Sequence, residues 1–197
     1  MQAAANTRSF SLYAKQGFQV RHHACHNFGG FLSPTEPPPP PTAADAGALS
    51  LAVMTEADVK DCADLFLTAH GRDCGWDRGP DIASFVRSDT PFPKLVVRDS
   101  DGRVIGYSTG FLIAGHQVAV SQGVFCAMFE ESSRLHQQMG LPCPRFHCPM
   151  EFPELASWAL AQGLALLRAT VIMTRGHYEH AWPDGSGCIV TPSIGGW

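Results

Sequence analysis

The sequence predicts an α/β protein with a mixed central sheet, and three observations support that fold class. Segments in which apolar residues recur at helical spacing alternate with short apolar or alternating segments typical of strands. A proline-rich stretch at residues 33–50 divides the chain. Residues 51–197 are enough for one complete domain, whereas residues 1–32 cannot bury enough surface to fold alone.

Residues 1–32 predict one amphipathic helix followed by one strand. Phe10 and Tyr13 follow helical spacing as far as a glycine stop, and residues 18–20 alternate as a strand does. We therefore expect this segment to be the end of a larger α/β domain whose beginning lies before Met1. Its helix must dock on another part of the protein or remain disordered.

The rest of the chain predicts a linker and then a complete domain. Five consecutive prolines within residues 33–50 favour an extended polyproline II spacer. In residues 51–197, Thr55 reads as a helix N-cap, Gly71 as a helix stop and Asp101-Gly102 as a hairpin turn. The expected elements are a strand at 51–54, helices at 55–70 and 82–87, a hairpin at 94–107, a strand at 115–120, a helix at 125–139, a strand at 146–150, a helix at 153–162, a buried strand at 164–173 and a last strand at 188–194.

Composition excludes several function classes. The chain is 45% hydrophobic and 16% charged, which favours a packed core over disorder. Its net charge of −4, without a basic stripe, indicates no nucleic-acid partner and no acidic membrane surface. No signal peptide or membrane-spanning apolar stretch is visible. The seven cysteines are odd in number and follow no framework spacing, so free thiols in a reducing, cytoplasmic compartment are expected.

The most specific pattern in the sequence is Asn6-x6-Tyr13-x3-Gly17-Phe18. Asn6 lies near the start of the expected helix, where its amide could bond a ligand or cap the backbone. Tyr13 lies two turns later on the same face, and a phenol there could act as a general acid toward a departing thiolate. The alternative is structural: a helix cap and a half-buried packing residue.

This pattern resembles the signature near the end of Gcn5-related N-acetyltransferase (GNAT) domains. The segment that begins at Leu51, LAVMTEADV, resembles the opening of another such domain. The ending, with Met173-x-x-Gly176-x-Tyr178 and later Pro192-Ser193-Ile194, resembles the C-terminus of tandem-domain members. The resemblance covers nearly the whole chain apart from the linker.

The resemblance implies a GNAT-like acyl-CoA N-acyltransferase fold with one complete domain, 51–197, and a helix–strand fragment of another, 1–32. It implies transfer of an acetyl group from acetyl-CoA to an amine of a small molecule or peptide. In this reading Asn6 contacts the pantetheine arm of the cofactor, and Tyr13 is the catalytic acid. No metal is expected, and a homodimer is an open alternative.

The sequence departs from the family pattern at two places. The family's phosphate-binding loop is replaced by Ser121-Gln122-Gly123, which offers amides but lacks the paired small residues and the arginine. Matching Gly163-Leu164 with Gly17-Phe18 places Ala159 where Tyr13 stands and Phe152 where Asn6 stands. The second domain therefore reads as a degenerate copy. The alternative function is a non-catalytic module that supports the fold, dimerises or binds a ligand.

Other groupings carry less information. Cys143, His147 and Cys148 lie close in sequence, with His177 and His180 downstream, but their spacing fits no recognised zinc pattern. Buried cysteines are the favoured interpretation. A cysteine–histidine nucleophile near position 25 has no orienting acid nearby in the sequence, and the histidines at 22, 23 and 26 read as surface residues. The four tryptophans are expected in packing roles.

Overall fold

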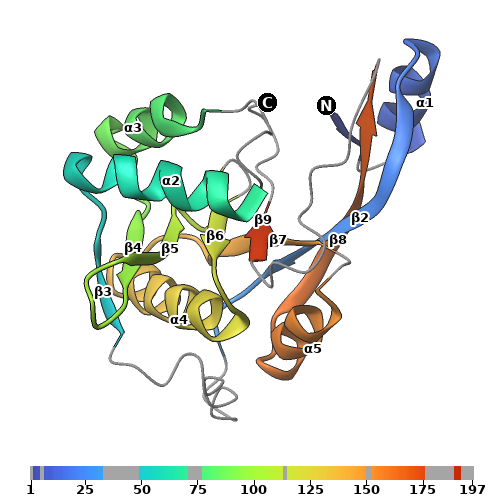
Figure 1. Cartoon of the computed structure of the whole chain (residues 1–197). Helices are drawn as coiled ribbons and strands as arrows, with labels where there is room; N and C mark the ends of the chain where they lie inside the picture. Colours follow the sequence, from blue (N-terminus) through green and yellow to red (C-terminus); the bar gives the residue numbers. More distant parts are fainter. Residues whose placement is uncertain are drawn as a thin grey trace.

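The computed structural model describes residues 2–4, 7–32, 49–70, 77–112, 115–149, 152–175 and 189–191. Its strands form two antiparallel sheets that meet through an apolar core, with helices packed around them (Figure 1). Most of the expected linker lies outside these residues. Among the helices described, none is long and apolar enough to cross a membrane.

The first sheet has five strands in the order β3-β4-β5-β6-β9. The predicted hairpin is confirmed, and Gly102 in its turn has a φ of 80°, which favours glycine. The last strand, β9, comes from the end of the chain and pairs with β6. The bounds are β3 (Ser50–Val53), β4 (Leu95–Arg98), β5 (Val104–Ser108), β6 (Gln117–Ala119) and β9 (Ile189–Thr191).

Three helices cover the first sheet. Figure 1 shows α2 (Val59–His70) and α3 (Gly79–Arg87) above the sheet and α4 (Gln122–Gln138) below it. A short 3-10 turn, η2 (Glu56–Asp58), leads into α2, and the carboxylate of Asp58 accepts the backbone N–H of Thr55 at 2.7 Å. The predicted helix start at Thr55 is thus confirmed.

The second sheet has four strands in the order β1-β8-β2-β7. Residues from both ends of the chain build it, because β2 lies between β7 and β8, and Asn27 stands opposite both His147 and Arg168. Residues 1–32 therefore share a sheet with the rest of the chain. The bounds are β1 (Gln2–Ala4), β2 (Gln19–Gly29), β7 (Arg145–Pro149) and β8 (Ala165–Thr174).

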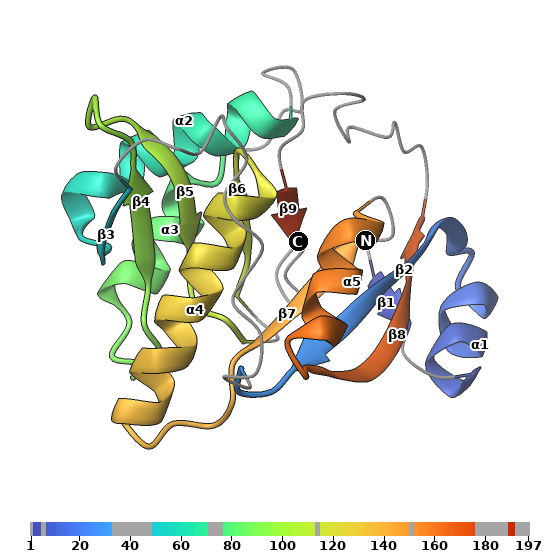
Figure 2. The ribbon, with the colours of Figure 1, turned by 90° about the horizontal axis from the view of Figure 1, so that it is seen from below.

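A single core cluster joins the two sheets. It contains Phe28 and Phe146 from the second sheet, Phe125 and Phe129 from α4, and Trp158 from α5 (Pro153–Ala161). Their rings meet mostly edge to face, with centroids 5.0 Å apart for Phe125 and Phe146. Figure 2 shows α4 and α5 together on the side of the molecule seen from below. A second cluster lies between the first sheet and α2.

The segments β1–α1–β2 and β7–α5–β8 are two copies of one strand–helix–strand unit. The helices α1 (Thr7–Lys15) and α5 each have nine residues. They start at residues 7 and 153 and end at 15 and 161, and the strands that follow start at 19 and 165, so each pair lies 146 positions apart. The copies meet where β2 pairs antiparallel with β8.

Both helices also end in the same way. The N–H of Phe18 donates to the carbonyl of Tyr13 at 3.0 Å, and the N–H of Leu164 donates to that of Ala159 at 3.0 Å. The glycines before them, at 17 and 163, have φ of 83° and 76° and donate to residues 14 and 160. This pair of bonds is the Schellman motif. The expected match of positions 17–18 with 163–164 is therefore present in the structure.

The structure differs from the predicted architecture in two respects. One mixed sheet was expected, but the described strand pairs are all antiparallel and form two sheets. The reason is that β2 enters the position between β7 and β8. The strand predicted at 164–173 forms as β8, but residues 165–169 are exposed, with Leu166 at 50%. Among the described residues, β8 has no partner on its outer side there, since β1 pairs with Val171, Ile172 and Met173.

Candidate functional site

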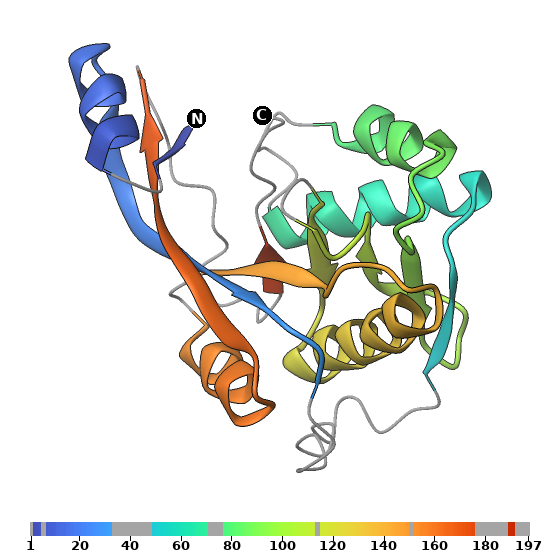
Figure 3. The same ribbon diagram turned by 180° about the vertical axis from the view of Figure 1, so that it is seen from behind.

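Tyr13, the predicted acid, lies on α1 at the far end of the second sheet. Its side chain is half-buried, and its ring packs against Phe18 with centroids 5.6 Å apart. Asn6, the predicted cofactor contact, lies outside the described residues. Figure 3 shows α1 at the end of β2 and β8 that is remote from α4. The structure therefore does not bring Tyr13 to the start of α4.

The start of α4 corresponds to the sequence position of the phosphate loop. Ser121 is the N-cap, and its hydroxyl accepts the N–H of Val124 at 3.3 Å. The N–H groups of Gln122 and Gly123 have no acceptor within the helix, and no acidic residue lies in the first turn. A 17-residue helix carries partial positive charge there, so these amides could receive an anion.

The backbone beside this helix start is closely packed. A Cβ added to Gly106 of β5 would lie 2.6 Å from Cγ1 of Val124, so glycine allows α4 to approach the sheet. Strand β6, which leads into α4, is paired on both edges, with β5 on one side and β9 on the other. Val118 stands opposite Val190 in the latter pairing. An extended ligand could not pair with that edge of β6 while β9 is in place.

A buried histidine lies where β7 meets β2. His147 is 1% exposed, and the amide nitrogen of Asn27 lies 3.3 Å from its Nε2 and 3.4 Å from its Nδ1. Since the two distances are nearly equal, the amide contacts the ring without favouring either nitrogen. Burial, helped by the charge of Arg168, lowers the pKa of His147 to about 4. The side chain is therefore neutral at physiological pH.

The environment of His147 was not predicted from the sequence, in which this residue lies close to Cys143 and Cys148 and was weighed with them as a possible zinc ligand. Consecutive residues of a strand point to opposite faces, and Cys148 belongs to the core cluster while His147 faces Asn27. The partner strand comes from the other end of the chain, so local sequence held no signal for this contact. Over the described residues, no group of three potential metal ligands is found.

A second buried polar group lies under α2. The hydroxyl of Tyr107 is 2.8 Å from Nε2 of His116, and the backbone N–H of His116 donates to Oγ1 of Thr109 at 3.0 Å. All three are buried, and burial raises the pKa of Tyr107. These bonds join the end of β5 to the start of β6. We assign them a structural role, because they satisfy polar groups inside the core.

The cysteines that the structure describes with side chains behave as packing residues. Cys62, Cys126 and Cys148 are buried, and Cys143 is partly exposed. Burial, chiefly, raises the pKa of Cys62 to about 12, so it is not a nucleophile at neutral pH. The expected packing role of Trp158 is confirmed by its place in the core. The other three tryptophans lie outside the described residues.

Comparisons with known proteins bear on the fold. No protein-family model and no curated protein sequence matches the chain. A solved structure that is similar is the crystal structure of a GCN5-related N-acetyltransferase from Sphaerobacter thermophilus, with a TM-score of 0.52 and 15% identity. The match covers 98% of this chain and 59% of that one. At this identity the likeness concerns the fold alone, and the chain thus has an α/β fold similar to that of a GCN5-related N-acetyltransferase.

Proposed function

We propose that the chain functions within a GNAT-type N-acyltransferase of two units, with residues 1–32 in one unit and residues 51–197 in the other. The reaction would transfer an acetyl group from acetyl-CoA to an amine, with Tyr13 as general acid and Asn6 as a cofactor contact. The repeated strand–helix–strand unit is the observation that carries this proposal. It places α1 and Tyr13 in the same local setting as α5, within a fold similar to that of a GCN5-related N-acetyltransferase.

The described residues fit acetyl-CoA only in part. The amides of Gln122 and Gly123 suit a phosphate group. The adjoining edge of β6 is occupied by β9, and Tyr13 lies on α1, remote from α4. The acid and the phosphate-binding amides therefore do not form one site in this chain, and we derive no catalytic step from it.

The same two observations favour a second candidate, a non-catalytic GNAT-like module. Strand β9 already pairs with β6, and Tyr13 lies far from the start of α4. Both features suit a domain that supports a fold or binds a ligand without turnover. The repeat supports this reading as well, since Ala159 stands where Tyr13 stands in the other copy.

Titration of acetyl-CoA into the purified 197-residue chain, followed by calorimetry, separates the two candidates. If the chain binds acetyl-CoA, we expect saturation, loss of binding in Asn6→Ala, and retained binding in Tyr13→Phe. Ser11→Ala, an exposed change on the same helix, serves as the control and should behave as the unchanged chain. An absence of binding at millimolar acetyl-CoA would contradict the acyltransferase proposal for this chain and favour the module.

A further inference from the structure

The two strand–helix–strand units differ in what lies over their helices. At matched positions, Trp158 of α5 is 4% exposed, whereas Leu12 of α1 is 53% exposed. Phe10, which matches the partly buried Ala156, is 39% exposed. Because helix length, loop length and C-terminal cap are the same in both units, local structure does not explain this difference.

The difference is confined to one face. Ser157 of α5 and its match Ser11 of α1 are both exposed, and so are Leu160 and its match Ala14. Where burial is described in both units, positions buried in the α5 unit are exposed or only partly buried in the α1 unit. The buried positions 158, 159, 162 and 164 match positions 12, 13, 16 and 18, each of which is exposed or only partly buried.

The structure also shows what covers this face in the α5 unit. The ring of Phe129, on α4, meets the ring of Trp158 edge to face, with centroids 5.9 Å apart. Leu155 and Ala159 lie in the same core cluster, together with residues of the first sheet such as Val97. The cover of α5 therefore consists of an antiparallel sheet and of helix α4, which contributes the aromatic side chains. These elements lie within residues 50–141.

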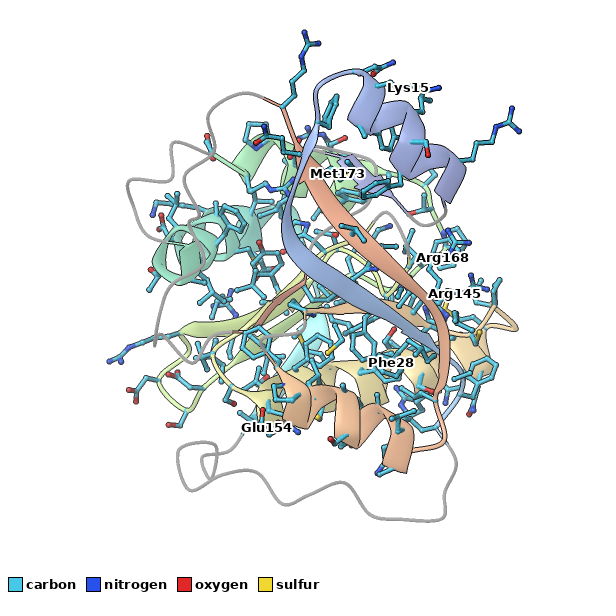
Figure 4. The ribbon with its side chains drawn as sticks, turned by 90° about the vertical axis from the view of Figure 1, so that its right-hand side faces the viewer. Lys15, Phe28, Arg145, Glu154, Arg168 and Met173 are labelled. Carbon is cyan, nitrogen blue, oxygen red and sulfur yellow. The ribbon has the colours of Figure 1, made fainter. Side chains whose placement is uncertain are left out.

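The edge of the second sheet beside α1 also has no covering element among the described residues. Strand β1 ends the second sheet and pairs, among the described strands, with β8 alone. Its counterpart β7 continues into the core shared with α4 and the first sheet, through Phe146. Figure 4 shows Lys15 of α1 and Glu154 of α5 at opposite ends of the paired β2 and β8, so the two helices lie apart from each other.

We propose that the α1 face, formed by Phe10, Leu12 and Tyr13, together with the β1 edge, docks a sheet-and-helix unit of the same build as residues 50–141. A second copy of this chain does not supply it, because the α4 of that copy is already covered by its own α5. The partner is a further polypeptide unit of this build. The proposal rests on the two-unit organisation above and not on acyl transfer.

A fused chain tests the docking directly. Residues 50–152 are joined to residue 7 of the chain 7–197, because residues 153 and 7 are matched starts of α5 and α1. The fusion omits β1, and the β7 strand of the added unit, its counterpart, takes the place of β1 beside α1. The short linkage gives the added unit a high effective concentration beside α1. We expect backbone amide exchange in α1, measured by mass spectrometry, to slow by about 100-fold relative to the unfused chain.

Two matched variants of the fused chain locate the contact. Leu12→Glu places a charge where α5 buries Trp158, so the gain in protection should be lost. Ser11→Glu lies on the exposed side of the same helix and should keep the gain. If both variants lose the gain in amide protection, or if neither does, the assignment of this face is overturned.

A second fusion keeps the proposal falsifiable if the first fails to dock. In it, residues 153–161 replace residues 7–15, so the α5 sequence occupies the α1 position. Protection in this chain but not with native α1 would show that the native face does not accept such a unit. Protection in neither would show that the two strand–helix–strand units are not equivalent. The assay contains no acetyl-CoA, so its outcome is independent of the calorimetric test.

Discussion

The α1 and α5 units have the same local structure but different energetics. Each has a nine-residue helix, a glycine with positive φ and the same pair of capping hydrogen bonds. One helix packs under α4, and the other presents its corresponding face to solvent. Local sequence therefore determines where a helix ends, whereas the covering layer determines which side chains stabilise the fold.

The largest expected effect compares Trp158 with its match, Leu12. Trp158→Ala removes a large buried side chain and should lower the free energy of unfolding by about 3–5 kcal/mol. Leu12→Ala removes one that is 53% exposed and should cost under about 1 kcal/mol. Urea unfolding of both variants measures the difference.

A control separates packing from hydrogen bonding at position 158. The indole N–H of Trp158 is buried and has no partner among the described residues. Trp158→Phe keeps most of the aromatic contact with Phe129 and removes this N–H, so we expect a loss of at most about 1.5 kcal/mol. Equal losses for Trp158→Ala and Leu12→Ala would contradict the proposed difference between the two helices.

The next effect concerns the contact between β2 and β7. The pKa of His147 is about 4 in the folded protein, below the ordinary histidine value near 6.5. Between these pH values the unfolded chain binds a proton that the folded chain does not, so stability falls as pH drops from about 6.5 to 4. The loss should reach about 3 kcal/mol at most.

Urea unfolding at a series of pH values measures this dependence. His147→Gln lacks the titrating ring, so its stability should vary less over the same range. A profile for His147→Gln that is as steep as that of the unchanged chain would show that other groups cause the dependence. Asn27→Ala leaves the histidine in place and should keep the steep profile, since burial is the main cause of the shift.

The elements were predictable from sequence to the extent that their signals are local. Thr55 and Asp58 form the expected cap, Gly102 the expected turn, and the match of positions 17–18 with 163–164 holds in the hydrogen bonds. The start of α4 was placed three residues late, because Ser121 and not a later residue is the cap. Helix α3 was likewise predicted three residues late, at 82 rather than 79.

What sequence did not predict depends on contacts between distant segments. The position of β2 between β7 and β8, the pairing of β9 with β6 and the Asn27–His147 contact each join residues far apart in the chain. The separation of Tyr13 from the start of α4 follows from the same arrangement. A motif identifies a residue type and its spacing, but the relative placement of two motifs depends on how the strands pair.

The smallest effect tests whether the two units are locally equivalent. Gly17 and Gly163 have φ of 83° and 76°, and a Cβ at either is disfavoured in that region by about 1–2 kcal/mol. At Gly17 no atom lies within 4 Å of an added Cβ, so the cost there is conformational rather than steric contact. Gly17→Ala and Gly163→Ala should therefore lower the free energy of unfolding equally. A clearly smaller loss for Gly17→Ala would show that α1, which lacks a covering layer, opens separately from the rest of the protein.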